Sequence, residues 1–252
     1  MSYRTRNRTS GISLSFPGFP PGVKWLIVAN VAVFLFGIVT ASSAAFTGHL
    51  STLQLVPEAV VEHFAIFELA TYLFLHGSFS HIIWNMLALW MFGAEIERAW
   101  GTKRFLQFYF FCGVGAGICV VIANYIVHTP GRPTIGASGA IFGILLVYAM
   151  LYPNRTILWG FLIPIKVKWF VLIIGTISFI SAIYGGNSGV SEFAHLGGLL
   201  FAYIYMKMPR GMSFDIAGPL GRSYRDWKLR RAKKKFQVYL RKQRSDRDPW
   251  VH

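Results

Sequence analysis

A serine and a histidine stand in segments that are otherwise apolar. Ser138 lies in the run Gly136-Ala137-Ser138-Gly139 at the edge of one apolar segment, and His195 lies just inside another. A strongly polar side chain at membrane depth costs several kcal/mol, so it usually persists where it lines a cavity or performs a function. A neutral imidazole beside a serine hydroxyl can accept its proton during attack on a carbonyl group. The two residue types therefore indicate nucleophilic catalysis inside a membrane.

Two glycines flank this serine, Gly136 and Gly139. They leave little steric cover, and the start of a helix offers free backbone N–H groups next to the serine hydroxyl. That surrounding suits a nucleophile beside a developing oxyanion. The alternative reading makes Ser138 an ordinary helix cap and His195 a buried histidine with its hydrogen bonds satisfied.

A second pair of polar side chains lies in an earlier apolar segment. His81 and Asn85 are four residues apart, which places them on one face of a helix. Both can donate hydrogen bonds, as stabilisation of a tetrahedral oxyanion requires. A polar contact between helices would explain the pair equally well. His76, five positions before His81, is as compatible with a structural role as with a functional one.

The histidines also raise the question of a metal site. His76, His81 and His195 supply three possible ligands. However, residues five positions apart point about 140° apart around a helix, unlike the pairs four apart that bind zinc on helices. We therefore expect no metal and no other cofactor.

The composition indicates a membrane protein that crosses the bilayer several times. Of 252 residues, 54% are hydrophobic and only 14% are charged, and the formal net charge is +15. Such segments satisfy their backbone groups as helices, since the alternating pattern of barrel strands is absent. We predict an all-α membrane protein, a bundle of six transmembrane helices at approximately residues 24–41, 72–94, 105–127, 135–152, 169–185 and 192–208.

Basic residues cluster at the chain ends and in alternate connections between these segments. The positive-inside rule then places both termini in the cytoplasm, and we expect a multi-pass protein of the plasma membrane. The first external loop, 41–71, lacks Lys and Arg and is too apolar for a solvated linker. We expect it to be an interfacial element packed against the bundle.

The four candidate side chains lie at similar predicted depths. Counted from the cytoplasmic end of each helix, the heights are roughly 22 Å for Ser138, 18 Å for His195, 21 Å for His81 and 15 Å for Asn85, in a core about 30 Å thick. Small residues in Gly139-x-x-x-Gly143 and Gly198-x-x-x-Ala202 further predict direct contact between the fourth and sixth helices.

These residues together resemble the rhomboid intramembrane serine proteases. The matching stretches run from His76 to Asn85, from Gly136 to Gly139 and from Ala194 to Gly198. The resemblance implies a six-helix core with Ser138 as nucleophile and His195 as base. It also implies that His81, Asn85 and the backbone N–H of Ser138 stabilise the oxyanion, while no carboxylate orients His195.

The resemblance further implies cleavage of single-span transmembrane protein substrates within or near their membrane segment. The alternative is a proteolytically inactive relative that only binds membrane clients. We predict three parts: a basic cytoplasmic segment at 1–23, the protease domain at 24–208 and a basic tail at 209–252. The tail has the pattern of an amphipathic helix and is expected to contact anionic lipids, with no nucleic acid as partner.

Overall fold

The computed structural model describes residues 18–40, 50–160, 162–184 and 189–208, together with Arg230, Arg231 and Lys233. The chain divides into two units, Met1–Met208 and Pro209–His252. Most of the predicted basic N-terminal segment lies outside the described residues. The predicted tail helix also lies outside them, apart from those three helical and exposed basic residues.

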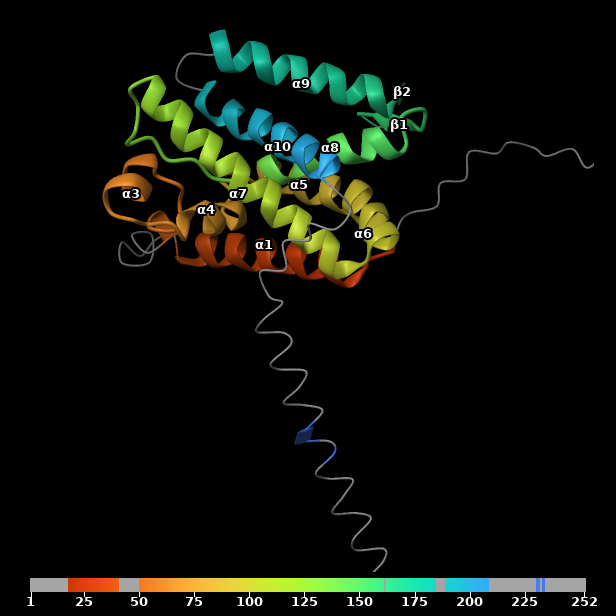
Figure 1. Cartoon of the computed structure of the whole chain (residues 1–252), viewed down its shortest axis with the longest axis horizontal. Helices are drawn as coiled ribbons and strands as arrows, with labels where there is room; N and C mark the ends of the chain where they lie inside the picture. The colour runs from red at the N-terminus through yellow and green to blue at the C-terminus, as the bar shows by residue number, and fades with distance from the viewer. Residues whose placement is uncertain are drawn as a thin grey trace, which may run out of the picture. The chain divides into compact units, whose positions relative to one another are not determined.

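Helices dominate the first unit (Figure 1). Within the described residues, six have ten residues or more: α1 (Pro21–Thr40), α5 (Phe79–Ala88), α7 (Thr102–Ile126), α8 (Ser138–Leu151), α9 (Val167–Tyr184) and α10 (Gly189–Lys207). Helix α10 packs against α7, α8 and α9. Three of the six, α1, α7 and α9, are long and apolar enough to cross a membrane. The structure is thus mostly helical with three candidate membrane spans.

The sequence predicted one continuous helix at residues 72–94, and this prediction is wrong. A short 3₁₀ helix, η1 (Tyr72–Phe74), precedes an irregular link, and α5 begins only at Phe79. Ser78 starts the helix there, because its hydroxyl accepts the N–H of His81 at 3.2 Å. A π-helical turn, η2 (Leu89–Gly93), then joins α5 to α6 (Ala94–Trp100). The helix that carries His81 and Asn85 therefore begins seven residues later than predicted, at Phe79, and a π-helical turn interrupts the segment at Leu89–Gly93.

The described part of the first external loop folds into short helices against α7. These are α3 (Pro57–Glu62) and α4 (Glu68–Thr71). Leu55 is fully buried and pairs with Thr134 through backbone hydrogen bonds in both directions. This pairing ties the loop to the segment that leads into α8. Residues 41–49 lie outside the described part of the chain.

A small antiparallel hairpin departs from the all-α prediction. Strand β1 (Thr156–Trp159) pairs with β2 (Ile163–Lys166) in the connection between α8 and α9. β-Branched and aromatic residues favour strands, and here Ile157 faces Ile165 while Trp159 faces Ile163. The hairpin lies at the opposite end of the helices from α3 and α4 (Figure 1). It forms the connection between α8 and α9.

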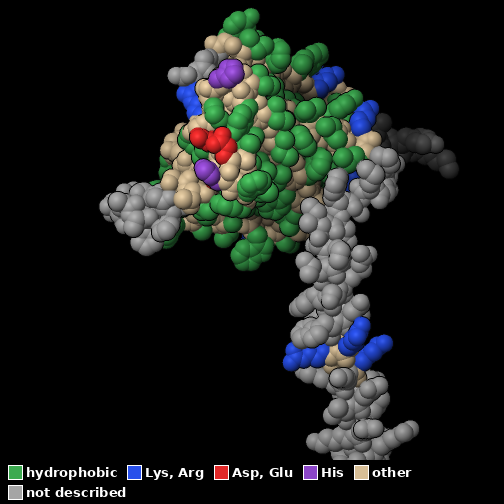
Figure 2. Space-filling model, turned by 60° about the vertical axis from the view of Figure 1, so that its left-hand side comes forward, with side chains coloured by type: hydrophobic (Ala, Val, Ile, Leu, Met, Phe, Trp, Pro, Cys, Tyr) green, Lys and Arg blue, Asp and Glu red, His purple; other side chains and the backbone are tan. Residues whose placement is uncertain are grey.

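Apolar side chains cover much of the outer surface (Figure 2). Helix α9 alone exposes a set of large ones: Trp169, Leu172, Ile173, Ile177, Phe179, Ile180, Ile183 and Tyr184. Soluble monomers rarely expose contiguous apolar patches of this kind, whereas lipid contact makes them favourable. The surface therefore agrees with a multi-pass membrane protein.

Helices α8 and α10 meet backbone to backbone, which confirms the predicted contact. A Cβ atom placed on Gly198 would overlap the carbonyl oxygen of Gly139. One turn further along α8, a Cβ on Gly143 would lie 3.2 Å from the carbonyl oxygen of Gly198. Small residues allow this approach because no side chain separates the helices. The same contact brings together the segments that carry Ser138 and His195.

Gly198→Ala is expected to lower the thermal unfolding midpoint of the protein in detergent. The added methyl group overpacks the contact, which typically costs about 1 to 3 kcal/mol. Gly37→Ala on α1 is the matched control, since a Cβ there meets only Leu50 at 3.4 Å. Equal midpoints for the two variants would contradict the close contact as a source of stability.

Candidate active site

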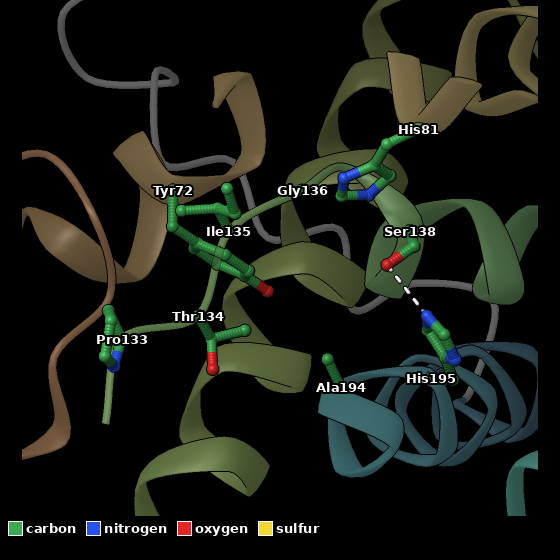
Figure 3. Close-up of a pocket in the computed structure, with 9 residues that line it drawn as sticks. All are labelled: Tyr72, His81, Pro133, Thr134, Ile135, Gly136, Ser138, Ala194 and His195. Carbon is green, nitrogen blue, oxygen red and sulfur yellow. Dashed lines mark hydrogen bonds between the residues drawn. The ribbon is translucent and has the colours of Figure 1, made fainter. Parts of the chain in front are cut away.

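Ser138 is the first residue of α8 and points across the helix interface. The residue before it, Ala137, forms the N-cap without a side-chain hydrogen bond, so the serine hydroxyl does not cap its own helix. Instead, its Oγ lies 2.9 Å from Nε2 of His195 (Figure 3). The backbone N–H groups at this helix start have no partner one turn earlier in the helix. The hydroxyl thus has an imidazole on one side and backbone N–H groups beside it.

His195 is held by contacts on its ring face and on both ring nitrogens. The phenyl ring of Phe142, one turn into α8, stacks on the imidazole with 4.1 Å between ring centres and an interplanar angle of 1°. On the side away from Ser138, Nδ1 lies 2.8 Å from a carboxylate oxygen of Glu192. Nδ1 is also 3.3 Å from the hydroxyl of Ser178 on α9. These neighbours fix the plane of the ring and its rotation.

The carboxylate beside His195 overturns one expectation. The family resemblance implies no acidic partner for the histidine, and that expectation is wrong in this chain, since Glu192 is within hydrogen-bond distance. Residues three apart share a helix face, so the sequence already placed Glu192 above His195 on α10. Spacing alone did not reveal that the side chain turns toward the ring.

His81 lies on the opposite side of Ser138, against the loop that precedes α8. Gly136 has a φ of +121°, and a Cβ there would lie 2.7 Å from Nε2 of His81 and 3.8 Å from the hydroxyl of Ser138. Its N–H donates to the carbonyl of Tyr72 at 2.9 Å. Glycine is required at this position by both the backbone conformation and the space. The loop therefore lets His81 approach Ser138 closely.

Asn85 and His76 lie behind His81. The Asn85 amide is buried and donates to the carbonyl of His81 at 3.0 Å, within its own helix. The His76 ring meets the His81 ring edge-on, with 4.9 Å between centres. Both residues thus contact His81, whereas His81 itself lines the cavity beside Ser138.

A cavity of about 240 Å³ opens beside the Ser138 hydroxyl. A liquid water molecule occupies about 30 Å³, so there is room for several waters or for part of a peptide. Figure 3 shows its walls, which come from α8, α10, η1, α5 and the loop before α8. The lining residues are Tyr72, His81, Pro133, Thr134, Ile135, Gly136, Ser138, Ala194 and His195.

Besides the Glu192 contact, the sequence did not predict three further side chains at this site. Phe142 and Ser178 carry no signal outside the fold, because an aromatic ring and a hydroxyl in apolar helices are common. Tyr72 is fully buried, and its hydroxyl donates to the carbonyl of Gly113 at 2.7 Å. Among the described residues, no group of three or more His, Cys, Asp or Glu side chains could hold a metal ion.

Comparison with known proteins gives a consistent result. Residues 63–210 match the Rhomboid domain. Over 204 residues the chain is 31% identical to the rhomboid protease GluP of Bacillus subtilis, covering 79% of this chain and 38% of GluP. It is 30% identical over 193 residues to the mitochondrial RHOMBOID-like protein 12 of Arabidopsis thaliana, covering 71% of this chain and 55% of that protein. The chain thus spans less than two thirds of the length of either relative.

Proposed function

Because this chain belongs to the rhomboid family, we propose that it is an intramembrane serine endopeptidase. Its substrates are single-span transmembrane proteins, cut within or near their membrane segment. The observation that carries the proposal is the 2.9 Å contact between the hydroxyl of Ser138 and Nε2 of His195. A serine and a neutral imidazole in this geometry form the nucleophile and general base of acyl transfer.

The proposed reaction follows from the positions of these side chains. His195 accepts the hydroxyl proton as the Ser138 oxygen attacks the scissile carbonyl, and then gives that proton to the leaving amine. The carbonyl oxygen becomes an oxyanion beside the N–H of Ser138 and the ring of His81. Water from the cavity then releases the acyl group by the same steps. The Asn85 amide helps to hold His81 in place by donating a hydrogen bond to the backbone carbonyl of His81.

The membrane arrangement is part of the same proposal. Six helical segments cross the bilayer, with both termini in the cytoplasm and the protein in the plasma membrane. Support comes from basic residues at one end of successive helices and in the connections there, namely Lys24, Arg98, Lys103, Arg104, Arg155, Lys166, Lys168 and Lys207. The basic tail after residue 208 is proposed to contact anionic lipids.

The test uses the full chain purified into liposomes together with a single-span model substrate. A fluorophosphonate, which reacts with activated serines, is expected to label the protein, and mass spectrometry of the labelled peptide should identify Ser138. The same preparation should release two substrate fragments. Substrate binding with neither label nor fragments would instead indicate a proteolytically inactive client-binding protein.

Asn85→Ala is expected to lower kcat by less than the roughly 100-fold that loss of one direct oxyanion donor can cost. The reason is that the Asn85 amide already donates a hydrogen bond to the carbonyl of His81, so it adds less to the oxyanion than the N–H of Ser138 and the ring of His81. Asn30→Ala is the matched control, because Asn30 is buried and donates to the carbonyl of Leu26, also four residues earlier, on α1. An equal loss of kcat in both variants would contradict a role of Asn85 at the site.

A further inference from the structure

Both ring nitrogens of His195 have a side-chain partner. Nε2 faces the hydroxyl of Ser138 at 2.9 Å, and Nδ1 faces the Glu192 carboxylate at 2.8 Å. The three side chains therefore form a continuous line from nucleophile to carboxylate. Ser138 and His195 take part in the proposed reaction above, whereas Glu192 has no role in it so far.

The chemistry of the three groups fixes the protons along this line. For Nε2 to accept the hydroxyl proton it must be unprotonated, so the single proton of the neutral ring sits on Nδ1. A carboxylate can only accept hydrogen bonds. The contact at 2.8 Å is therefore an Nδ1–H donating to Glu192, and it favours the tautomer that the base requires.

A second acceptor competes for the same ring nitrogen. The Ser178 hydroxyl lies 3.3 Å from Nδ1, which is longer than the distance to Glu192. A hydrogen bond to an ionised acceptor is also about twice as strong as one between neutral groups. The geometry and the charge both favour Glu192 as the principal partner.

The location of Glu192 makes a carboxylate tolerable at this depth. It lies in the first turn of α10, where the helix dipole stabilises negative charge. Its side chain is 26% exposed and that of His195 is 19% exposed, so neither group is fully removed from water. The desolvation cost of a deeply buried pair is thereby reduced.

The line of contacts also matters once the proton has moved. When His195 takes the proton of Ser138, the ring becomes a cation, and the nearby carboxylate stabilises that charge. The other polar side chains within hydrogen-bond distance of the ring are the hydroxyls of Ser138 and Ser178, which carry no charge. Glu192 is thus the one anion among these described neighbours of the ring.

We propose that Glu192 is a positioning residue that holds His195 in its reactive tautomer and orientation, so that Ser138, His195 and Glu192 work as a triad. This inference rests on the proposed protease function. The carboxylate touches neither substrate nor nucleophile and keeps its charge throughout the cycle. It acts only through the imidazole.

The test measures kcat and KM separately for cleavage of a single-span substrate by the full chain in liposomes. Glu192→Gln preserves the shape but removes the charge, and it is expected to lower kcat between about 10-fold and 10³-fold, toward the larger losses seen when a triad carboxylate is neutralised. KM and the unfolding midpoint should stay at wild-type values. Glu192→Asp, which keeps the charge on a shorter side chain, should recover part of the lost kcat.

Glu95→Gln is the matched control. Glu95 on α6 pairs with Arg155, so this variant also removes one carboxylate from an ion pair, away from the dyad. It should cleave at the wild-type rate. If Glu192→Gln does not fold, Glu192→Asp decides: reduced kcat at unchanged KM supports the proposal, and unchanged kcat overturns it.

Several results would overturn the inference while leaving the proposed function intact. One is that the wild-type protein cleaves the substrate and the Glu192→Gln variant has the same kcat as wild type. Another is a larger loss of kcat in Ser178→Ala than in Glu192→Gln, which would make the hydroxyl the partner of Nδ1. In contrast, a wild-type protein that neither cleaves nor reacts with the fluorophosphonate would overturn the proposed function itself.

Discussion

Replacing Ser138 with alanine is expected to abolish cleavage of a single-span substrate, by a factor on the order of 10⁴ or more. No other hydroxyl among the described residues lies within hydrogen-bond distance of Nε2 of His195. The remaining groups of the site would still bind the peptide and polarise its carbonyl, but they would have no nucleophile to offer. Fragment release from liposomes, followed over several hours, measures the effect.

Ser80→Ala provides the control for this substitution. Ser80 is exposed on α5, next to His81 in sequence, and its hydroxyl contacts only the Ser78 hydroxyl in the described structure. It should cleave at nearly the wild-type rate. Equal cleavage by wild type and Ser138→Ala would end the proposal of a serine protease.

His195→Ala is expected to cost nearly as much as loss of the serine. The Nε2 atom of the His195 imidazole lies 2.9 Å from the Ser138 hydroxyl. Without this ring the hydroxyl proton has no acceptor, and an uncharged hydroxyl is a weak nucleophile. Groups that act as a unit are strongly non-additive, so the double variant Ser138→Ala/His195→Ala should be no less active than Ser138→Ala alone. The measurement is kcat/KM for the two single variants and the double variant.

The exposed His63 supplies the control for histidine loss, and His63→Ala should behave as wild type. Substantial cleavage by His195→Ala would show that another group activates the serine. A further loss in the double variant, beyond that in either single variant, would mean that the two residues act independently. Either result would contradict the dyad.

The sequence predicted the meeting of Ser138 and His195 because two simple quantities determine it. Helix rise sets the depth of each residue, and small residues set which helices approach closely. Both quantities can be counted along the chain. The structure brings the hydroxyl and imidazole together as those counts predicted.

Features that depend on side-chain direction were less predictable. The position of Glu192 three residues before His195 was visible, yet its contact with Nδ1 depends on a rotamer and on the space left by α8 and α9. Likewise, the spacing of His81 and Asn85 predicted one shared face, but not that the Asn85 amide would turn back to its own helix.

Irregular backbone was the other source of error. A hydropathy pattern does not distinguish a helix from an apolar segment whose first residues form a loop. The start of α5 at Phe79 is set instead by the cap from Ser78, which hydropathy does not detect. The hairpin of β1 and β2 was missed because each strand has only four residues, too few for a clear alternating pattern.

The glycine contact between α8 and α10 has a consequence for membranes of different thickness. A bilayer that is too thick or too thin for a helix is accommodated largely by tilting. Gly139 follows Ser138 directly, and Gly198 lies less than one turn beyond His195, so the two helices touch next to the reactive side chains. Rotation about a pivot moves distant points far and nearby points little. The spacing of hydroxyl and imidazole should therefore survive changes in lipid chain length that displace the outer ends of the same helices.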